Sequence, residues 1–232
     1  MVTVMDHKIL SLFQLCDSNF PTGAFSHSFG LESYIQEELV HNHETFSEWL
    51  KVYIEEQLVN TDGLASKLVY QALEEENFQM VWKLDRLLMV QNLPRETREG
   101  SQRMGERMLE LVQSLFQIPI LSTYRKRIDA KQSFGHPSIV FTIVAHDLDV
   151  PKSTAILFYL YSVVSSLVQN AVRGIPLGQT AGQKIIRDIQ PQLVNAVETI
   201  LQLDEEEFGI VSPGLELSQM RHERVNIRIF MS

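Results

Sequence analysis

Apolar residues recur along most of the chain at intervals of three and four positions, which place them on one face of an α-helix. Two segments show this spacing most clearly: Met104, Met108, Leu111 and Leu115, and Ile186, Ile189, Leu193, Val197 and Ile200. A further helix is expected to begin after Thr61-Asp62-Gly63, with one edge formed by Leu64, Leu68, Ala72 and Glu76. The pattern therefore predicts an all-α fold.

Proline and glycine mark the expected ends of the helices, at residues 21–23, 92–94, 118–119, 135–137, 150–151, 175–176 and 212–214. Pro191 lies inside the pattern of residues 184–203, so this helix is expected to be kinked or broken in two. No long polar linker, repeat or low-complexity tract interrupts the chain. We therefore expect a single-domain bundle of about ten helices over residues 1–232, ending in an extended tail.

The last residues alternate with a period of two, with Val225, Ile227, Ile229 and Met231 on one side and Asn226, Arg228, Phe230 and Ser232 on the other. This period suits an extended segment, but the predicted fold has no sheet for the segment to join. Its backbone groups still need partners. We therefore expect the tail, residues 223–232, to fold over a groove on its own domain or to dock on another chain.

Composition favours a soluble globular protein, because 44% of the 232 residues are hydrophobic and 21% are charged. Cys16 is the only cysteine, so neither an intramolecular disulfide nor a cysteine-based metal cluster can form. This usage, with no secretory leader at the start of the sequence, predicts the cytoplasm. The net charge of −9 argues against nucleic acid as a partner.

Residues 153–172 carry no charge and are long enough to cross a bilayer. The stretch also contains Ser, Thr, Gln and Asn side chains, which favour protein neighbours over lipid. We expect a helix buried on all sides at the centre of the fold, and no membrane association.

The run Ser26-His27-Ser28 suggests a hydrolase at first sight, but no strand precedes it to form a nucleophile elbow. If residues 24–37 are helical, Ser26 and His27 point about 100° apart and do not face each other. In that helix Ser26, Gly30 and Ser33 form a stripe of small side chains. We therefore predict that the segment packs closely against a second helix.

The segment PLGQTAGQK, residues 176–184, lacks the spacing of a phosphate-binding loop and has Ile185 where that loop needs a hydroxyl. It is interpreted as a helix start, with Pro176 in the first turn and with Gly178 and Gly182 allowing close packing. The groups His41, His43 and Glu44 and His222 with Glu223 supply fewer ligands than a zinc or nickel site requires. No resident metal or cofactor is expected, although weak surface binding by His41 and His43 stays open.

Four separated motifs resemble the urease accessory protein F family: DSNFPTGAFSHSFGLESYIQ from residue 17, Arg98-Glu-Gly-Ser101 with Gly105, GHPSIVF at 135–141, and RGIPLGQTAGQK followed by the terminal MRHERVNIRIFMS. The resemblance implies an all-helical, non-catalytic helper in nickel insertion into apo-urease. It also implies a homodimer that binds an accessory protein, D or H, and an accessory GTPase, G, which holds the nickel and the nucleotide.

The resemblance places partner-contact residues at Gly23, Phe25, Ser26, His27, Gly30, Glu32, Arg173, Gly178, Gln179, Thr180, Gln183, Arg221, His222, Arg228 and Phe230. This chain departs from the family at Phe25, where relatives often have Tyr, and at Ala181, where many have Asp. The first change removes a hydroxyl from the opening motif, and the second removes a carboxylate from the 176–184 segment.

Joining these motifs, we hypothesise that Arg228 and Phe230 pack near the loop of residues 22–28. Docking of the D or H protein on the tail would then order that loop and present a composite surface to the GTPase. Two alternatives stay open at this stage. One is a small helical enzyme that uses His27, His136 or His146 as a base in an internal pocket, and the other is a nickel carrier that uses His41, His43 or His222.

Overall fold

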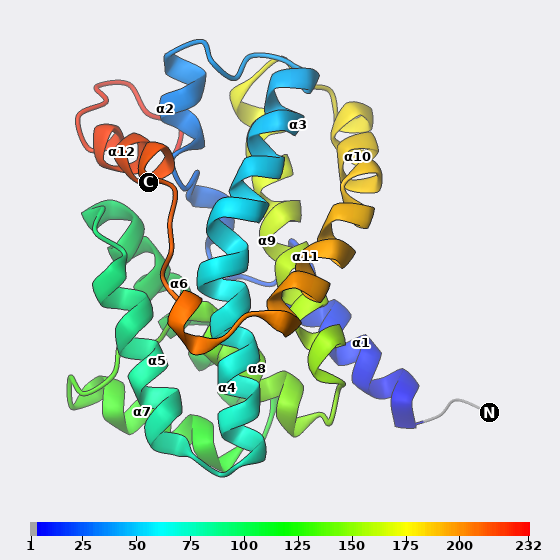
Figure 1. Ribbon diagram of the computed structural model, residues 1–232, viewed down its shortest axis with the longest axis vertical. Helices are drawn as coiled ribbons and strands as arrows, with labels where there is room; N and C mark the ends of the chain where they lie inside the picture. The colour runs from blue at the N-terminus through cyan, green and yellow to red at the C-terminus, as the bar shows by residue number, and fades with distance from the viewer. Residues whose placement is uncertain (1–3) are drawn as a thin grey trace.

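The computed structural model describes residues 4–232, and this part of the chain is all-helical, without a strand (Figure 1). Its α-helices are α1 (Val4–Cys16), α2 (Leu31–Gln36), α3 (His43–Val52), α4 (Leu64–Glu74), α5 (Phe78–Gln91), α6 (Arg95–Leu115), α7 (Pro119–Asp129), α8 (Pro137–Asp147), α9 (Lys152–Gly174), α10 (Gln179–Asp188), α11 (Gln190–Gln202) and α12 (Pro213–His222). Short 3₁₀ turns occur at η1 (Ala24–Ser26) and η3 (Glu205–Glu207). The predicted all-α class is confirmed.

The apolar helix predicted at the centre of the fold is α9, which runs through the middle of the view in Figure 1. It contacts α1, α2, α4, α8, α10 and α11. It is long and apolar enough to cross a membrane, but half of its most apolar 18-residue window is buried inside the protein. Within the helix only Ser153 and Arg173 are exposed. It is therefore a core helix packed against protein on most of its surface.

The helix expected to begin after Thr61-Asp62-Gly63 instead continues one that starts much earlier. Residues Tyr53–Gly63 form a π-helical segment, η2, that joins α3 to α4 without a turn. Gly63 keeps right-handed helical backbone angles, and a Cβ at this position would collide with Ile200 on α11. The glycine thus serves a close helix crossing and does not end a helix.

The other predicted breaks fall where helices end. Pro119, Pro137 and Pro213 lie in the first turns of α7, α8 and α12, where a missing N–H costs nothing. The predicted interruption near Pro191 is also confirmed, because α10 ends at Asp188 and α11 begins at Gln190. The positions of the prolines therefore predicted most of the helix boundaries correctly.

The motif at residues 135–141 starts α8 against the side of α6. A Cβ on Gly105 of α6 would overlap the carbonyl oxygen of Gly135, so the two backbones can cross this closely only without a side chain. Buried Asp85 on α5 fixes the turn by accepting hydrogen bonds from the backbone N–H groups of Phe134 and His136, at 2.7 and 3.1 Å. This part of the resemblance therefore has a packing explanation.

Candidate functional site

A buried carboxylate, Glu32 at the start of α2, joins α12 and the tail to the body of the protein. Its Oε2 atom lies 2.8 Å from Nε2 of His222 and accepts a hydrogen bond from the backbone N–H of Phe230 at 3.1 Å. Its Oε1 atom accepts from the N–H of Ile229 at 2.6 Å. The side chain is 3% exposed, so these bonds are shielded from water. Glu32 is the hub of the site.

His222 connects this hub to a second carboxylate, Glu96 in the first turn of α6. Nδ1 of His222 lies 2.9 Å from Oε2 of Glu96, and Nη1 of Arg228 lies 2.7 Å from the other oxygen. Burial by itself would raise the pKa of Glu96, but the hydrogen bonds from His222 and Arg228 outweigh burial and lower it. Because both nitrogens of His222 face carboxylates, the ring can donate both hydrogen bonds only when it is protonated.

Arg228 therefore bonds to Glu96 on α6 and to carbonyls of the tail, whereas the hypothesis had it pack near the loop of residues 22–28. Its remaining guanidinium nitrogens donate to the carbonyls of Val225 and Glu223, both at 2.8 Å. These bonds fold residues 223–228 into a compact turn closed by the arginine itself. The correction is specific to Arg228, because the end of the tail does reach that loop.

Arg173 at the end of α9 lies between the two aromatic rings that the resemblance brought forward. Its guanidinium carbon is 4.8 Å from the ring centroid of Phe230 and 5.7 Å from that of Phe25. The same group donates to the carbonyl of Phe25 and, at 2.5 Å, to Oδ1 of Asn170. Asn170 in turn donates to the carbonyl of His27 at 2.7 Å. One end of α9 thus holds the opening motif and the tail together.

The tail also bonds directly to the opening motif. The N–H of Met231 donates to the carbonyl of Ser26 at 2.7 Å, and the N–H of Ser28 donates to the carbonyl of Ser232 at 2.5 Å. The hydroxyl of Ser232 lies 2.8 Å from Nδ1 of His27. The tail has thus folded over its own domain, one of its two predicted positions. The apolar face is not the buried one, since Phe230 and Ser232 point inward.

His27 is buried in this contact and lies against Gly100 of α6, where a Cβ would come within 2.7 Å of the ring. Burial, and then the charges of Arg103 and His222, lower its pKa to about 4. The bonds of this ring go to the tail, and among the described residues neither Ser26 nor Ser28 is hydrogen-bonded to it. The serine, histidine and serine run therefore has no geometry for nucleophilic attack.

The helix expected over residues 24–37 is broken, because Phe29 and Gly30 both have left-handed backbone angles, with φ of 52° and 91°. Close packing of a second helix is nevertheless present, and that helix is α12. Ser33 donates to the carbonyl of Ser218 at 2.8 Å, and Ser218 donates to the carbonyl of Gly30 at 2.9 Å. Of the predicted stripe, Gly30 and Ser33 form this contact, and Ser26 contacts the tail.

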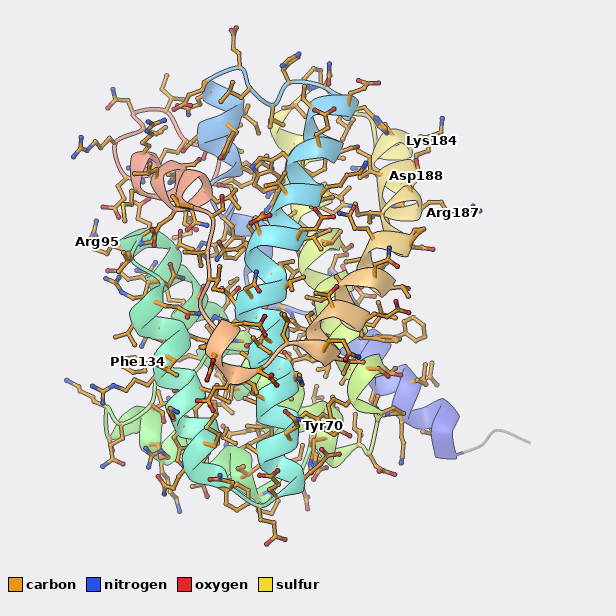
Figure 2. The ribbon with its side chains drawn as sticks, viewed as in Figure 1. Tyr70, Arg95, Phe134, Lys184, Arg187 and Asp188 are labelled. Atoms are coloured by element: carbon orange, nitrogen blue, oxygen red, sulfur yellow. The ribbon has the colours of Figure 1, made fainter. Side chains whose placement is uncertain are left out.

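Four of the residues that the resemblance singled out lie apart from this cluster. They are Gly178, Gln179, Thr180 and Gln183, at the exposed start of α10. Arg221 neighbours His222 on α12, and its Nη1 atom donates to Oε1 of Glu37 at 3.0 Å. Figure 1 shows α10 and α12 on opposite sides of α3, and Figure 2 shows Lys184 and Arg187 of α10 pointing away from the body. The candidate residues therefore occupy two separate surfaces.

The segment around α10 fits its predicted packing role in part. A Cβ on Gly182 would come within 2.9 Å of Val172, so this glycine does allow α10 to approach α9 closely. Gly178 has open space around it and Pro176 precedes the helix, because α10 begins at Gln179. The helix start is thus real, but it lies later than predicted.

A cavity of about 300 Å³ lies between α6, α8, α9 and η2. Of the predicted partner-contact residues of the opening motif, Gly23 and Phe25 line it. Of the three candidate histidine bases, His136 lines it, whereas His27 and His146 do not. Within residues 4–232 no group of three or more His, Cys, Asp or Glu side chains is placed to hold a metal ion. The cavity therefore offers one histidine and no metal cluster in the described part of the chain.

Several members of the site were missed from the sequence: Glu96, Asn170, Ser218 and Ser232. Glu96, Asn170 and Ser218 lie in helices and Ser232 lies in the tail. The sequence pattern around each of them predicts its secondary structure but no contact with the site. Their roles come from contacts over more than a hundred residues of sequence, such as Asn170 with His27 and His222 with Glu96. Only the hydrophilic character of Asn170 within an apolar helix offered a signal.

Comparison with known proteins gives a consistent result. The model of the family described as UreF matches residues 40–190. The urease accessory protein UreF of Bacillus sp. (strain TB-90) is 55% identical over 226 residues, which cover 97% of this chain and 100% of that protein. The urease accessory protein UreF of Lachnoclostridium phytofermentans (strain ATCC 700394 / DSM 18823 / ISDg) is 54% identical over 228 residues, covering 98% and 100%.

Proposed function

This chain belongs to the UreF family of urease accessory proteins, and we propose that it scaffolds nickel insertion into apo-urease. In this proposal it is a homodimer in the cytoplasm that binds the accessory protein D or H and the accessory GTPase G. It modulates the GTP-dependent step without binding nucleotide itself. A role as an enzyme is set aside, because members of this family are non-catalytic accessory proteins.

The outer face of the tail is the observation that carries the proposal. Ile227, Ile229 and Met231 are 85%, 58% and 55% exposed, and Phe25 beside them is 62% exposed. Large apolar side chains gathered on a surface are typical of a protein-binding site. Because Glu32 and Ser26 fix the backbone of this row, little conformational entropy is lost when a partner covers it.

We assign this row to the D or H protein. The hypothesis that the partner orders the opening loop is revised accordingly. In the chain alone, the tail already holds the end of that loop through its hydrogen bonds to Ser26 and Ser28. The partner would recognise a preformed surface made of the tail and Phe25. The exposed start of α10, with Gln179, Thr180 and Gln183, forms a second surface that we assign to a different partner contact.

A pull-down with tagged accessory protein D tests the assignment. Ile229→Asp and Met231→Asp place a charge on the outer face and leave the inward Phe230 and Ser232 unchanged. Val90→Asp, at an equally exposed apolar residue on α5, is the matched control. We expect both tail variants to lose capture and the control to retain it, with circular dichroism the same in all. Wild-type capture of both tail variants would overturn the assignment.

A further inference from the structure

The cavity described above is partly open to solvent, and one side of it is lined by two pieces of chain that lie next to the tail. Residues Asp17 to Phe25, here called the covering segment, line it continuously, and α12 adds Glu216 and Gln219. The opposite walls come from regular helices, including Ser101 of α6. The covering segment is thus the irregular part of the cavity wall.

The covering segment has few bonds of its own to the helical body. Its backbone hydrogen bonds lie within the segment or next to it, as from Phe20 to Asp17 and from Thr22 to Phe20. Among the described residues, the side-chain bond that reaches it from a helix of the body is the one from Arg173 to the carbonyl of Phe25. Segments with so few long-range bonds open at low free-energy cost.

The tail holds the end of this segment in place. Met231 bonds to Ser26, directly after Phe25, and Ser232 bonds to Ser28. Arg173, which holds Phe25, is itself covered by the ring of Phe230 at 4.8 Å. Loss of the tail from its seat would therefore remove the neighbours of Ser26 and Ser28 and uncover the arginine at once.

We propose that the tail is a latch for this partly open cavity. While Phe230 and Ser232 are bound in place, the covering segment stays against the cavity and shields its inner wall. When the tail detaches, the segment moves away, the cavity widens and its inner wall becomes more accessible to solvent and solutes. The inference goes beyond the proposed function, because it describes the free chain and requires no partner.

The single cysteine provides a natural reporter for this opening. Cys16 lines the cavity at the last residue of α1, directly before the covering segment, and its Sγ donates to the carbonyl of Phe158 at 3.3 Å. Burial raises the pKa of its thiol to about 12, so the closed state reacts slowly with thiol reagents. Since the chain has no other cysteine, reagent uptake measures access at this one place.

The experiment measures the rate at which 4,4′-dithiodipyridine, an uncharged reagent, modifies Cys16 under native conditions. Phe230→Ala and Glu32→Gln unseat the tail by different means, one by removing the buried ring and the other by weakening the carboxylate hub. We expect each variant to raise the modification rate roughly tenfold or more. Loss of one or two charged hydrogen bonds shifts the equilibrium between the closed and open segment by about this factor.

Two controls separate latching from general loss of stability. Glu37→Gln removes an exposed carboxylate at the opposite end of α2, where it forms an ion pair with the exposed Arg221, and it should leave the rate unchanged. Leu121→Ala destabilises the core at α7, which does not line the cavity, and it should raise the rate far less than a tail variant of equal stability. Unchanged rates in both tail variants, or an equal rise in Leu121→Ala, would overturn the proposal. Because no partner is present, this outcome is independent of the pull-down.

Discussion

The Nε2 atom of His222 lies 2.8 Å from the Oε2 atom of Glu32, with side chains that are only 1% and 3% exposed. The pair joins the last turn of α12 to the first turn of α2, two elements separated by most of the chain. Buried ion pairs often add little net stability, because the charges lose their hydration. Their value here is positional, since the same carboxylate also holds the N–H groups of Ile229 and Phe230.

Glu32→Gln should lower the free energy of unfolding by about 3 kcal/mol, because an amide has only one acceptor atom and cannot accept all the buried hydrogen bonds from His222, Ile229 and Phe230. Urea denaturation followed by the fluorescence of Trp49 and Trp82 measures this change. The exposed Glu37→Gln variant should stay within about 0.5 kcal/mol of the unmodified protein. Equal stability of the two variants would mean that Glu32 does not organise the site.

Stability should fall as the solution becomes mildly acidic, because of His27. Its pKa is about 4 in the folded protein and 6.5 in the unfolded chain, so between these values the unfolded state binds more protons. The contribution is complete above about pH 6.5 and is lost as the pH falls toward 4, about 3 kcal/mol in total. Urea midpoints measured across this range give the slope.

His27→Gln removes the titrating ring and serves as the control for this slope. The variant should be less stable at neutral pH but should depend less on pH between 6.5 and 4 than the unmodified protein. An unchanged slope would assign the acid sensitivity to other groups, such as Glu96.

Gly105→Ala should destabilise the protein by roughly 3 kcal/mol, because the added methyl group overlaps the backbone of Gly135 where α6 and α8 cross. Gly214→Ala, in the first turn of α12, is the matched control. Its new Cβ would meet no atom closer than 3.6 Å, so the substitution should be neutral or slightly stabilising. Thermal unfolding compares the two, and an equal effect would contradict the crossing described here.

Helical periodicity predicted the class and most helix boundaries, because apolar spacing and proline chemistry act over a few residues. It missed the π-helical join at Tyr53–Gly63, since Gly63 reads locally as a break although its role is to approach Ile200. It also predicted a helix through Phe29 and Gly30, whose left-handed angles are maintained by contacts with α12. Such contacts join distant parts of the chain, so the local pattern of apolar and polar residues cannot predict them.

In the candidate site too, some residues were predicted from the sequence and others were found only in the structure. His27, Glu32, His222 and Phe230 came from the resemblance, and the structure brings them together. Their partners Glu96 and Asn170 were not predicted, because an acid in the first turn of α6 and an amide in α9 have ordinary local explanations. The sequence also did not predict which face of the tail is buried, since alternation by itself does not say which face is covered.

Nickel content of urease tests the central claim most directly. Apo-urease would be activated in cells that carry the accessory proteins together with this chain, either unmodified, with Ile229→Asp and Met231→Asp combined, or with the control Val90→Asp. The account predicts that urease purified from the double variant contains little nickel, while the control matches the unmodified protein. Full nickel content with the double variant, at equal levels of folded protein, would contradict the claim that the outer face of the tail serves urease maturation.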